Sequence, residues 1–343
     1  MSETKGKVVI TGGAGFVGSQ LGLSLHQAGY DVTLLDNMAF GHLDNLLHDG
    51  LSFGQLIVKD IRSPLSTLQE IFTDATAVFH LAGIAALPVC QEDPQLAYDV
   101  NVSGTGNVLE ACRLAGVRRV IFASTSATYE NTKSEIYKET DVICPNLVYS
   151  MTKQAAEQMC AAYASNYGMD IIIVRFFNIY GPHQDFKRKS PPFTSYLATS
   201  IAKGVSPKIF NRDTSTLRDY VFSADLIELL TKMMCSSRYY AAEIFNACSG
   251  TGHSAPSIFQ LMKMHAGCAD LAAQYGDPKQ FWDKYEKLSR KPYPLCPERV
   301  LKEVYKQSIG DPNKTLAEFG WVAKTEMSEG LRKVYDYASR CTS

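Results

Sequence analysis

Residues 11–18 read TGGAGFVG, and this stretch decides how the chain can fold. It follows a short apolar run and precedes a segment, residues 19–28, whose apolar side chains fall on one side of a helix. Gly12 allows a tight turn there, Gly15 lets a pyrophosphate approach the backbone, and Gly18 lets the helix pack closely on the strand. The first N–H groups of the helix can then bind phosphate oxygens. The context therefore favours a dinucleotide-binding turn over a glycine-rich turn without a ligand.

The composition indicates an ordinary globular protein of 343 residues, with 45% hydrophobic and 20% charged residues. A chain of this length can bury one large core or two closely joined ones. The formal net charge is −1, and outside Lys187–Lys189 the basic residues are scattered. Nucleic acids and anionic membranes need a broad basic surface. We therefore expect a small-molecule partner, with no nucleic acid and no membrane.

Targeting and metal-binding patterns are missing from the sequence. The start, MSETKGK, has no apolar segment of a secretion signal, and no stretch approaches the roughly 18 unbroken apolar residues of a membrane span. We therefore expect a cytoplasmic protein. Nine cysteines occur without CxxC or Cys/His ligand spacing, so we expect reduced, mostly structural thiols and no metal.

Short segments rich in Val, Ile, Leu and Phe alternate with helical patterns, which is typical of an α/β fold with a doubly wound parallel sheet. The expected strands are Lys7–Thr11, Asp31–Asp36, Gln55–Asp60, Ala77–Ala82, Arg119–Ser124 and Met169–Phe177. The expected helices are Phe16–Ala28, Pro64–Phe72, Pro94–Ala115 and Tyr149–Tyr167.

After about residue 180 the pattern becomes irregular, interrupted by prolines and glycines. We expect residues 1–178 to form a Rossmann-type NAD-binding domain. Residues 240–250 return to it, with Glu243–Ala247 as one more strand. Residues 179–343 otherwise form a smaller, interleaved C-terminal α/β lobe for the substrate.

Two carboxylates at strand ends bear on the cofactor. Asp36 closes the second strand, 21 residues after Gly15. A carboxylate there accepts hydrogen bonds from the adenosine ribose and repels a 2′-phosphate, and no Arg or Lys follows within five residues. NAD is therefore expected rather than NADP, with an ordinary loop carboxylate as the alternative. Asp60 closes its own strand, where it could meet the adenine.

The chemistry is expected at the carboxyl ends of later strands. The fifth strand runs into FASTSATYE, residues 122–130, and YSMTK follows at Tyr149–Lys153. The i, i+4 spacing places Tyr149 and Lys153 on one face of a helix. A neighbouring ammonium lowers the pKa of a phenol and makes it a usable base. An ordinary amphipathic helix is the alternative for this motif taken alone.

Several ordered segments together resemble the extended short-chain dehydrogenases/reductases of the nucleotide-sugar epimerase and dehydratase kind. The segments are TGGAGFVG, LLDNMAFGHLDNL, VFHLAG, DVNVSGTGNVLEACRLAGVRRVIFASTSATY, YSMTK, RFFNIYGPHQ, LRDYVFSADL and KEVYKQSIGDPNKTLAEFGW. The resemblance covers almost the whole chain. It implies a Rossmann domain that holds NAD and a lobe that holds a nucleoside diphosphate sugar, with UDP as the expected nucleotide.

The resemblance also implies the residues that form the site. Those expected around the cofactor are Gly12, Gly15, Phe16, Val17, Asp36, Asn37, Asp60, Ile61, Leu81, Ala82, Gly83, Asn101, Tyr149 and Lys153. Those expected around the substrate are Ser126, Asn178, Arg218 and Arg299. Asn178 could instead cap a loop, and Arg218 could instead form a surface ion pair with Asp219.

The reaction depends on two positions after the fifth strand. Dehydratases that this chain resembles carry an Asp-Glu pair where Ser126 and Ala127 stand, and related decarboxylases carry Glu at the second of these positions. The remaining groups suit a reversible oxidation at C4, and hence a 4-epimerase. Tyr149 is the expected base and Thr125 its partner on O4, with Ser124 as an alternative. Decarboxylation, dehydration, reduction, or NAD(H) sensing without turnover remain open.

Four departures from the family pattern lie on the substrate side. Glu130 stands where a glycine usually ends the fifth-strand motif, and NRDTSTLRD lacks the usual glycines. Residues 268–297 form a longer connection than usual, and Arg299 is one position away from the expected second diphosphate-binding arginine. The sugar could thus belong to the glucose, N-acetylglucosamine or glucuronate series.

Relatives of this kind pair two helices across a homodimer interface, and we expect a homodimer here. The supporting apolar residues are Val108, Leu109, Cys112, Met159 and Ala162.

Overall fold

A seven-stranded parallel sheet forms the centre of the structure, a computed structural model that describes residues 4–342. The strands are β1 (Lys7–Thr11), β2 (Asp31–Asp36), β5 (Gln55–Val58), β6 (Ala75–His80), β7 (Arg119–Thr125), β8 (Ile171–Phe176) and β12 (Glu243–Ala247). Their order is β12-β8-β7-β6-β1-β2-β5. Because β6 returns to the far side of β1 after β2 and β5, the winding reverses between β1 and β6. The carboxyl ends of these two strands are the usual ligand site of such a sheet.

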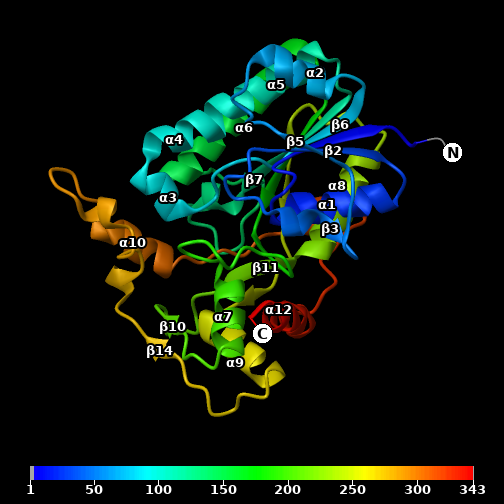
Figure 1. The fold of residues 1–343 in the computed structure, drawn as a ribbon. Helices are drawn as coiled ribbons and strands as arrows, with labels where there is room; N and C mark the ends of the chain where they lie inside the picture. The colour runs from blue at the N-terminus through cyan, green and yellow to red at the C-terminus, as the bar shows by residue number, and fades with distance from the viewer. Residues whose placement is uncertain (1–3, 343) are drawn as a thin grey trace.

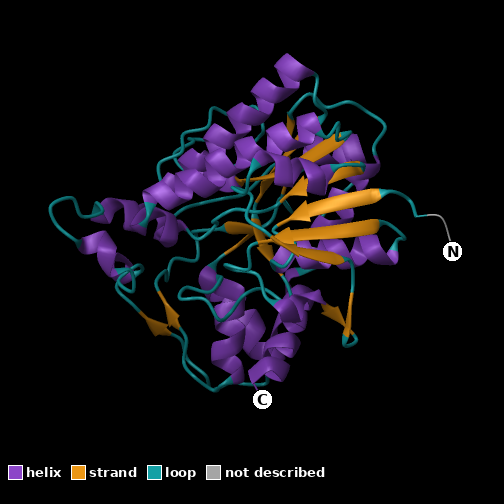
Figure 2. Ribbon diagram, turned by 45° about the horizontal axis from the view of Figure 1, so that its top comes forward, coloured by secondary structure: helices purple, strands orange, loops and turns teal. Residues whose placement is uncertain are grey.

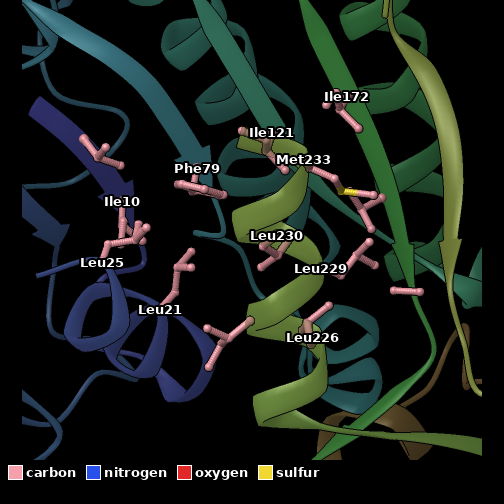
Figure 3. Packing of buried hydrophobic residues seen from close by; sticks show 14 of the residues in the cluster. Ile10, Leu21, Leu25, Phe79, Ile121, Ile172, Leu226, Leu229, Leu230 and Met233 are labelled. Carbon is pink, nitrogen blue, oxygen red and sulfur yellow. The ribbon is translucent and has the colours of Figure 1, made fainter. Parts of the chain in front are cut away.

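Helices cover both faces of the sheet (Figure 1). One face carries α1 (Phe16–Gln27) and α8 (Ser223–Cys235), and the other carries α2 (Leu65–Phe72), α5 (Gly104–Leu114) and α6 (Val148–Tyr167). Figure 3 shows the first of these layers, in which labelled side chains of α1 and α8 pack toward the strands: Leu21, Leu25, Leu226, Leu229, Leu230 and Met233 against Ile10, Phe79, Ile121 and Ile172. The expected doubly wound fold is confirmed.

Strand β1 shows why its sequence is continuously apolar. Val8 and Ile10 belong to the core on the α1 side, whereas Val9 belongs to the core on the α5 side. All three side chains are fully buried. Each such burial stabilises the fold by roughly 1.5–3 kcal/mol, so a strand covered on both faces uses apolar residues at every position.

Some strand ends differ from the sequence expectation. Strand β6 covers Ala75–His80 rather than residues 77–82, and β5 ends at Val58 rather than at Asp60. After β6 the chain turns toward β1, because the N–H of Ala82 donates to the Thr11 side chain at 3.2 Å. Strands β7 and β8 differ from the expectation by one or two residues at their ends.

The expected helix at residues 94–115 is one helical run with an interruption. It consists of α4 (Pro94–Tyr98), a π-helical turn (Asp99–Ser103) and α5, and α3 (Leu87–Glu92) precedes it. The π turn carries Asn101 into the interior, where the side chain is buried. Such turns are frequent at functional sites.

The later part of the chain builds a second core beside the sheet (Figure 2). It contains α7 (Phe193–Ala202), α9 (Ala255–His265), α12 (Met327–Thr342) and a three-stranded sheet of β9 (Asn178–Tyr180), β11 (Arg218–Phe222) and β13 (Gly252–His253). Strand β12 pairs with β8 in the first sheet, and α11 (Asn313–Phe319) packs on β12 and α8. None of the helices within residues 4–342 is long and apolar enough to cross a membrane.

The long connection at residues 268–297 forms a small core with residues next to α6 and in α10. It includes β14 (Gln274–Tyr275), which pairs with β10 (Lys208–Ile209), and it leads into α10 (Pro297–Val304). Figure 1 shows the region around α10 extending beside α3. Trp282 and Tyr285 are buried against Leu147 and Val300. The connection therefore contacts the residue that precedes α6.

Most residues expected at a dimer interface are used inside the monomer. Val108, Leu109 and Cys112 are fully buried against the sheet, and Met159 packs on the same core. Ala162 is exposed. These helices therefore leave fewer apolar residues free for a dimer interface than the sequence suggested.

Candidate active site

The turn after β1 has the shape of a phosphate-binding turn. Gly12 has φ +72°, and a Cβ there would lie 2.8 Å from the backbone N of Ala82, so no other residue fits. A Cβ at Gly18 would overlap the carbonyl oxygen of Gly12. Helix α1 begins after Gly15 without a side-chain cap, so no side chain competes for its first N–H groups. The residues around this turn fit a dinucleotide pyrophosphate.

Asp36 is fixed beside this turn at the end of β2. One carboxylate oxygen accepts a hydrogen bond from the N–H of Ala14 at 3.0 Å, and the other accepts one from Met38 at 2.8 Å. The side chain is largely buried. Each carboxylate oxygen can accept a further hydrogen bond, as a ribose diol would require.

Asp60 lies in a polar cluster beyond β5 rather than in the strand. It accepts a hydrogen bond from Asn37 at 2.7 Å and two from the Arg62 guanidinium at 2.9 Å each. The hydrogen bonds from Arg62 are the main reason why the pKa of Asp60 lies well below its usual range. Ile61 is buried in the core on the α5 side of the sheet.

The loop after β6 is held by Asn101. Its side chain accepts a hydrogen bond from the N–H of Ile84 at 2.8 Å and donates to the Ile84 carbonyl at 3.1 Å. A Cβ at Gly83 would lie 3.0 Å from Asn101 Oδ1 and 3.4 Å from Lys153 Nζ. The structure thus brings Gly83, Asn101 and Lys153 together, with Leu81 and Ala82 directly before them. Asn101 therefore fixes the loop after β6.

His80 is a buried polar residue that the sequence motifs did not single out. Its ring bridges the hydroxyl groups of Thr11, at 2.8 Å, and Thr105, at 3.0 Å. Burial lowers the pKa of His80 to about 3, so the ring is neutral. It ties the end of β6 to β1 and to α5. In the sequence, the signal that could have identified His80 was a histidine at the end of an apolar strand.

Tyr149 and Lys153 are both buried on one face of α6, as their spacing predicts. Burial raises the pKa of Tyr149 to about 12, and a hydrogen bond with the Thr125 side chain opposes this shift. Lys153 donates to the carbonyl of Ala123 at 2.8 Å, and burial lowers its pKa to about 8. The expectation that Lys153 lowers the pKa of Tyr149 does not hold in this structure. The ammonium is directed to a backbone oxygen, and the desolvation of the phenol dominates.

The hydroxyl of Ser124 is directed away from Tyr149, into a buried network. It donates a hydrogen bond to Glu157, which forms a two-point ion pair with Arg175 at 2.9 and 2.7 Å. Arg175 also donates to the Tyr129 hydroxyl at 2.8 Å. Glu157 follows Lys153 by one more helical turn, a spacing that the sequence prediction did not use. Thr125 is therefore the hydroxyl that lies with Tyr149.

The substrate-side residues have partners in the second core. Asn178 donates to the backbone of Asp219 at 2.7 Å and so ties β9 to β11. Arg218 pairs with Glu303 of α10 at 3.0 Å, whereas Asp219 accepts hydrogen bonds from Ser249, Gly250 and Gly310. The alternative of an Arg218–Asp219 ion pair is therefore wrong.

Two further cations and one serine complete this side. Arg299 donates to the side chain of Asn146, just before α6, so it contacts the segment that leads into the helix of Tyr149. Lys306 lies 3.9 Å from Glu303, the partner of Arg218, and it belongs to the quoted segment KEVYKQSIGDPNKTLAEFGW, although the sequence analysis did not single it out. Ser126 is buried in the short 3-10 turn after β7, next to Thr125.

This arrangement can bind a dinucleotide and exchange a proton with an alcohol. The phosphate-binding turn, the Asp36 carboxylate and the buried phenol all lie at the carboxyl edge of the sheet. Such a site belongs to the class of dinucleotide-dependent α/β enzymes, in which a phenol takes the alcohol proton while hydride leaves the same carbon.

The chain belongs to the NAD dependent epimerase/dehydratase family, whose sequence model matches residues 8–248. It is 27% identical over 331 residues to a putative UDP-glucose 4-epimerase of Methanocaldococcus jannaschii, covering 96% of this chain and 97% of the relative. The crystal structure of Thermotoga maritima UDP-glucose 4-epimerase with UDP-glucose is 26% identical, with a TM-score of 0.84 and coverage of 98% and 100%. The crystal structure of Thermus thermophilus UDP-glucose 4-epimerase in complex with NAD is 28% identical, with a TM-score of 0.79 and coverage of 97% and 98%.

Proposed function

We propose that this chain is an NAD-dependent 4-epimerase of a nucleoside diphosphate sugar, acting through a transient 4-keto sugar. The UDP-hexoses of the glucose, N-acetylglucosamine and glucuronate series are the expected substrates. One observation carries the proposal: Tyr149 is a buried phenol whose raised pKa is partly lowered by the Thr125 side chain, with no carboxylate in the two positions that follow Thr125. The relatives named above as UDP-glucose 4-epimerases support it.

The residues at the edge of the sheet fit NAD. Gly12 and Gly15 leave room at the helix N-terminus for the pyrophosphate, and Asp36 offers carboxylate oxygens to the adenosine ribose. Phe16 and Val17 begin the helix at this turn, and Asn37 and Asp60 would contact the adenine. When bound, NAD supplies the hydride acceptor for C4 of the sugar, and the positive charge of its oxidised ring favours a nearby phenolate.

Tyr149 takes the proton from the O4 hydroxyl in the first half-reaction and returns it to O4 in the second. Thr125 hydrogen-bonds to the phenol, which partly offsets the burial that raises the pKa of Tyr149 to about 12. Its hydroxyl group can also hold O4. The 4-keto sugar then turns over in the site, so that hydride returns to its other face.

The residues after Thr125 favour epimerisation over elimination or decarboxylation. Ser126 and Ala127 are buried in the 3-10 turn, and neither can supply the acid or base that elimination of water needs. Ser124 is already engaged with Glu157. Only reversible oxidation at C4 uses the groups that are present, and a sensor without turnover would have no use for a base.

The second core is proposed as the substrate lobe. Arg218 would contact the diphosphate, and Asn178 would face the sugar or its diphosphate with its free amide oxygen. The domain division proposed here is residues 1–178 with 240–250 for NAD and the rest of 179–343 for the substrate. Arg299 would also belong to this site, because it donates a hydrogen bond to Asn146 beside α6.

A cytoplasmic homodimer completes the proposal. Tyr98 of α4 and Met151 of α6 are 42% and 45% exposed, and Ala162 is exposed farther along α6. These exposed apolar residues lie on the two helices that relatives of this kind pair, which supports a dimer although the core residues named earlier do not.

The test is a panel of UDP-sugars with separation of the products. The purified protein should convert one series at C4 without net formation of NADH. The matched control is Tyr149→Phe, which keeps the ring but removes the base. Turnover of this variant should fall by roughly 10²- to 10⁴-fold while bound NAD is retained. Dehydrated or decarboxylated products, or full activity of the variant, would contradict the proposal.

A further inference from the structure

Three polar side chains form a row across the face of the sheet that α6 covers. They are Ser124 of β7, Arg175 of β8 and Asn246 of β12, which lie side by side in the strand register. Two residues earlier along each strand, the residues on the same face are apolar, namely Phe122, Ile173 and Ile244. The three polar residues are at most 3% exposed. Burying polar groups opposes folding unless they are hydrogen-bonded, so this row needs partners.

Glu157 of α6 is the partner that joins the helix to this row. Its carboxylate accepts two hydrogen bonds from the Arg175 guanidinium, at 2.9 and 2.7 Å, and a third from the Ser124 hydroxyl. Both charged groups are buried. Replacing a buried ion pair by well-packed apolar residues is often neutral or stabilising, so net stability alone does not explain such a pair. Its directional hydrogen bonds do fix where β7, β8 and α6 lie relative to one another.

The same face of α6 carries the residues of the proposed reaction. Tyr149, Lys153 and Glu157 are spaced four residues apart and lie on successive helical turns. Lys153 donates to the carbonyl of Ala123 at 2.8 Å, and Glu157 accepts from the hydroxyl of the next residue, Ser124. The residue after that is Thr125, whose side chain lowers the pKa of Tyr149. Two consecutive residues of β7 are therefore tied to α6 directly before the one that acts on the base.

We propose that Glu157 is a positioning residue of this site, which holds the end of β7 against α6 so that Thr125 keeps its place beside Tyr149. The inference rests on the proposed function, because it takes Tyr149 as the base and Thr125 as its partner. Glu157 acts through Ser124, the neighbour of Thr125 in the strand. Without this tie the Thr125 hydroxyl is held less firmly, and a displacement of about 1 Å can cost on the order of 10²-fold in rate.

The experiment compares two buried ion pairs on the same two strands. Glu157→Gln removes the negative charge of the pair at the carboxyl ends of β7 and β8. The matched control is Asp170→Asn, because Asp170 pairs with the buried Arg119 at the amino ends of these strands. Both variants should lose thermal stability, since each leaves a buried arginine without its counter-charge. In Glu157→Gln kcat should fall roughly 10-fold with KM changed less than about twofold, whereas Asp170→Asn should keep both values within about twofold.

Ser124→Ala is the second variant, and it keeps the ion pair while removing its link to β7. Its kcat should fall by roughly 3- to 10-fold, again with little change in KM. Combination with Thr125→Val tests the route of the effect. If Ser124 acts through Thr125, the double variant should be as active as Thr125→Val alone, within about twofold. Losses that multiply in the double variant would show that Ser124 does not act through Thr125, and the inference would be wrong.

A measurement without substrate separates this inference from the proposed function. Hydrogen exchange followed by mass spectrometry reports how firmly residues 122–130 are held. Exchange there should be faster in Glu157→Gln and Ser124→Ala than in the unmodified protein, and much less affected in Asp170→Asn. If no UDP-sugar is converted, the proposed function fails, and the exchange result alone decides whether Glu157 holds β7. Unchanged exchange in both site variants, or an equal loss of kcat in Asp170→Asn, would overturn the inference and leave the function intact.

Discussion

At neutral pH the cofactor-free Lys153→Met variant should be more stable than the unmodified protein, although its turnover and NAD binding should be impaired. Lys153 is 5% exposed, and burial lowers its pKa from 10.5 to about 8. A pKa lower in the folded than in the unfolded chain means that the charged form opposes folding. Each pH unit corresponds to about 1.4 kcal/mol, so the charge costs about 3 kcal/mol of folding free energy.

The sign of the pH dependence follows from these two pKa values. Below about pH 8 Lys153 is charged in both states, so the full cost is present. As the pH rises from about 8 to 10.5, the folded protein loses the proton first and the cost disappears. The stability of the unmodified protein should therefore rise by about 3 kcal/mol relative to Lys153→Met across this interval.

The assay is urea unfolding of both proteins, free of NAD and under reducing conditions, at several pH values. At neutral pH the gain from removing the charge is reduced by about 1–3 kcal/mol, because the carbonyl of Ala123 loses its hydrogen bond. This loss is the same at every pH, so it does not affect how the difference in unfolding free energy between the two proteins changes with pH. A difference in unfolding free energy that stays constant across the interval would refute the reasoning. In the same variant turnover should drop and NAD should bind more weakly.

The other predictions concern single groups of the site. Thr125→Val should lower turnover more than substrate affinity and move the acidic limb of the rate profile to higher pH, because its hydrogen bond lowers the pKa of Tyr149. Gly12→Ala should cost about 1–3 kcal/mol of unfolding free energy and abolish NAD binding, since the Cβ would lie 2.8 Å from Ala82 N. The protein should purify with NAD and bind it more tightly than NADP, and Asp36→Ala should reduce this preference. Equal or tighter NADP binding by the unmodified protein would contradict the role of the carboxylate.

Local patterns predicted the elements whose residues are determined by burial. Strands β1, β2 and β12 begin and end where the sequence patterns predicted them. Each is an apolar run covered by helices, so its composition reports its environment directly. The end of β6 was misplaced, because Leu81 and Ala82 are apolar yet belong to the loop that lines the site. Apolar character alone cannot separate a strand from an apolar loop.

Partners distant in the sequence were beyond prediction. Ser124 donates a hydrogen bond to Glu157, 33 residues away, and Arg218 donates one to Glu303, 85 residues away. Glu130 was noted as a departure from a motif, but its hydrogen bonds with Asn146, Leu147 and Ser150 depend on the fold that brings it to the start of α6. A motif gives the residue type, whereas the charge balance around that residue depends on the tertiary structure.

Hydrogen transfer at C4 tests the central claim most directly. The protein is incubated in deuterated water with the UDP-sugar that it converts, and both epimers are isolated and examined by NMR and mass spectrometry. If Tyr149 handles only the O4 proton while hydride leaves and returns at C4, both epimers should keep the original hydrogen at C4, and no deuterium should appear there. Deuterium at C4 of the product would show that a proton was abstracted from carbon, and the proposed mechanism would be wrong.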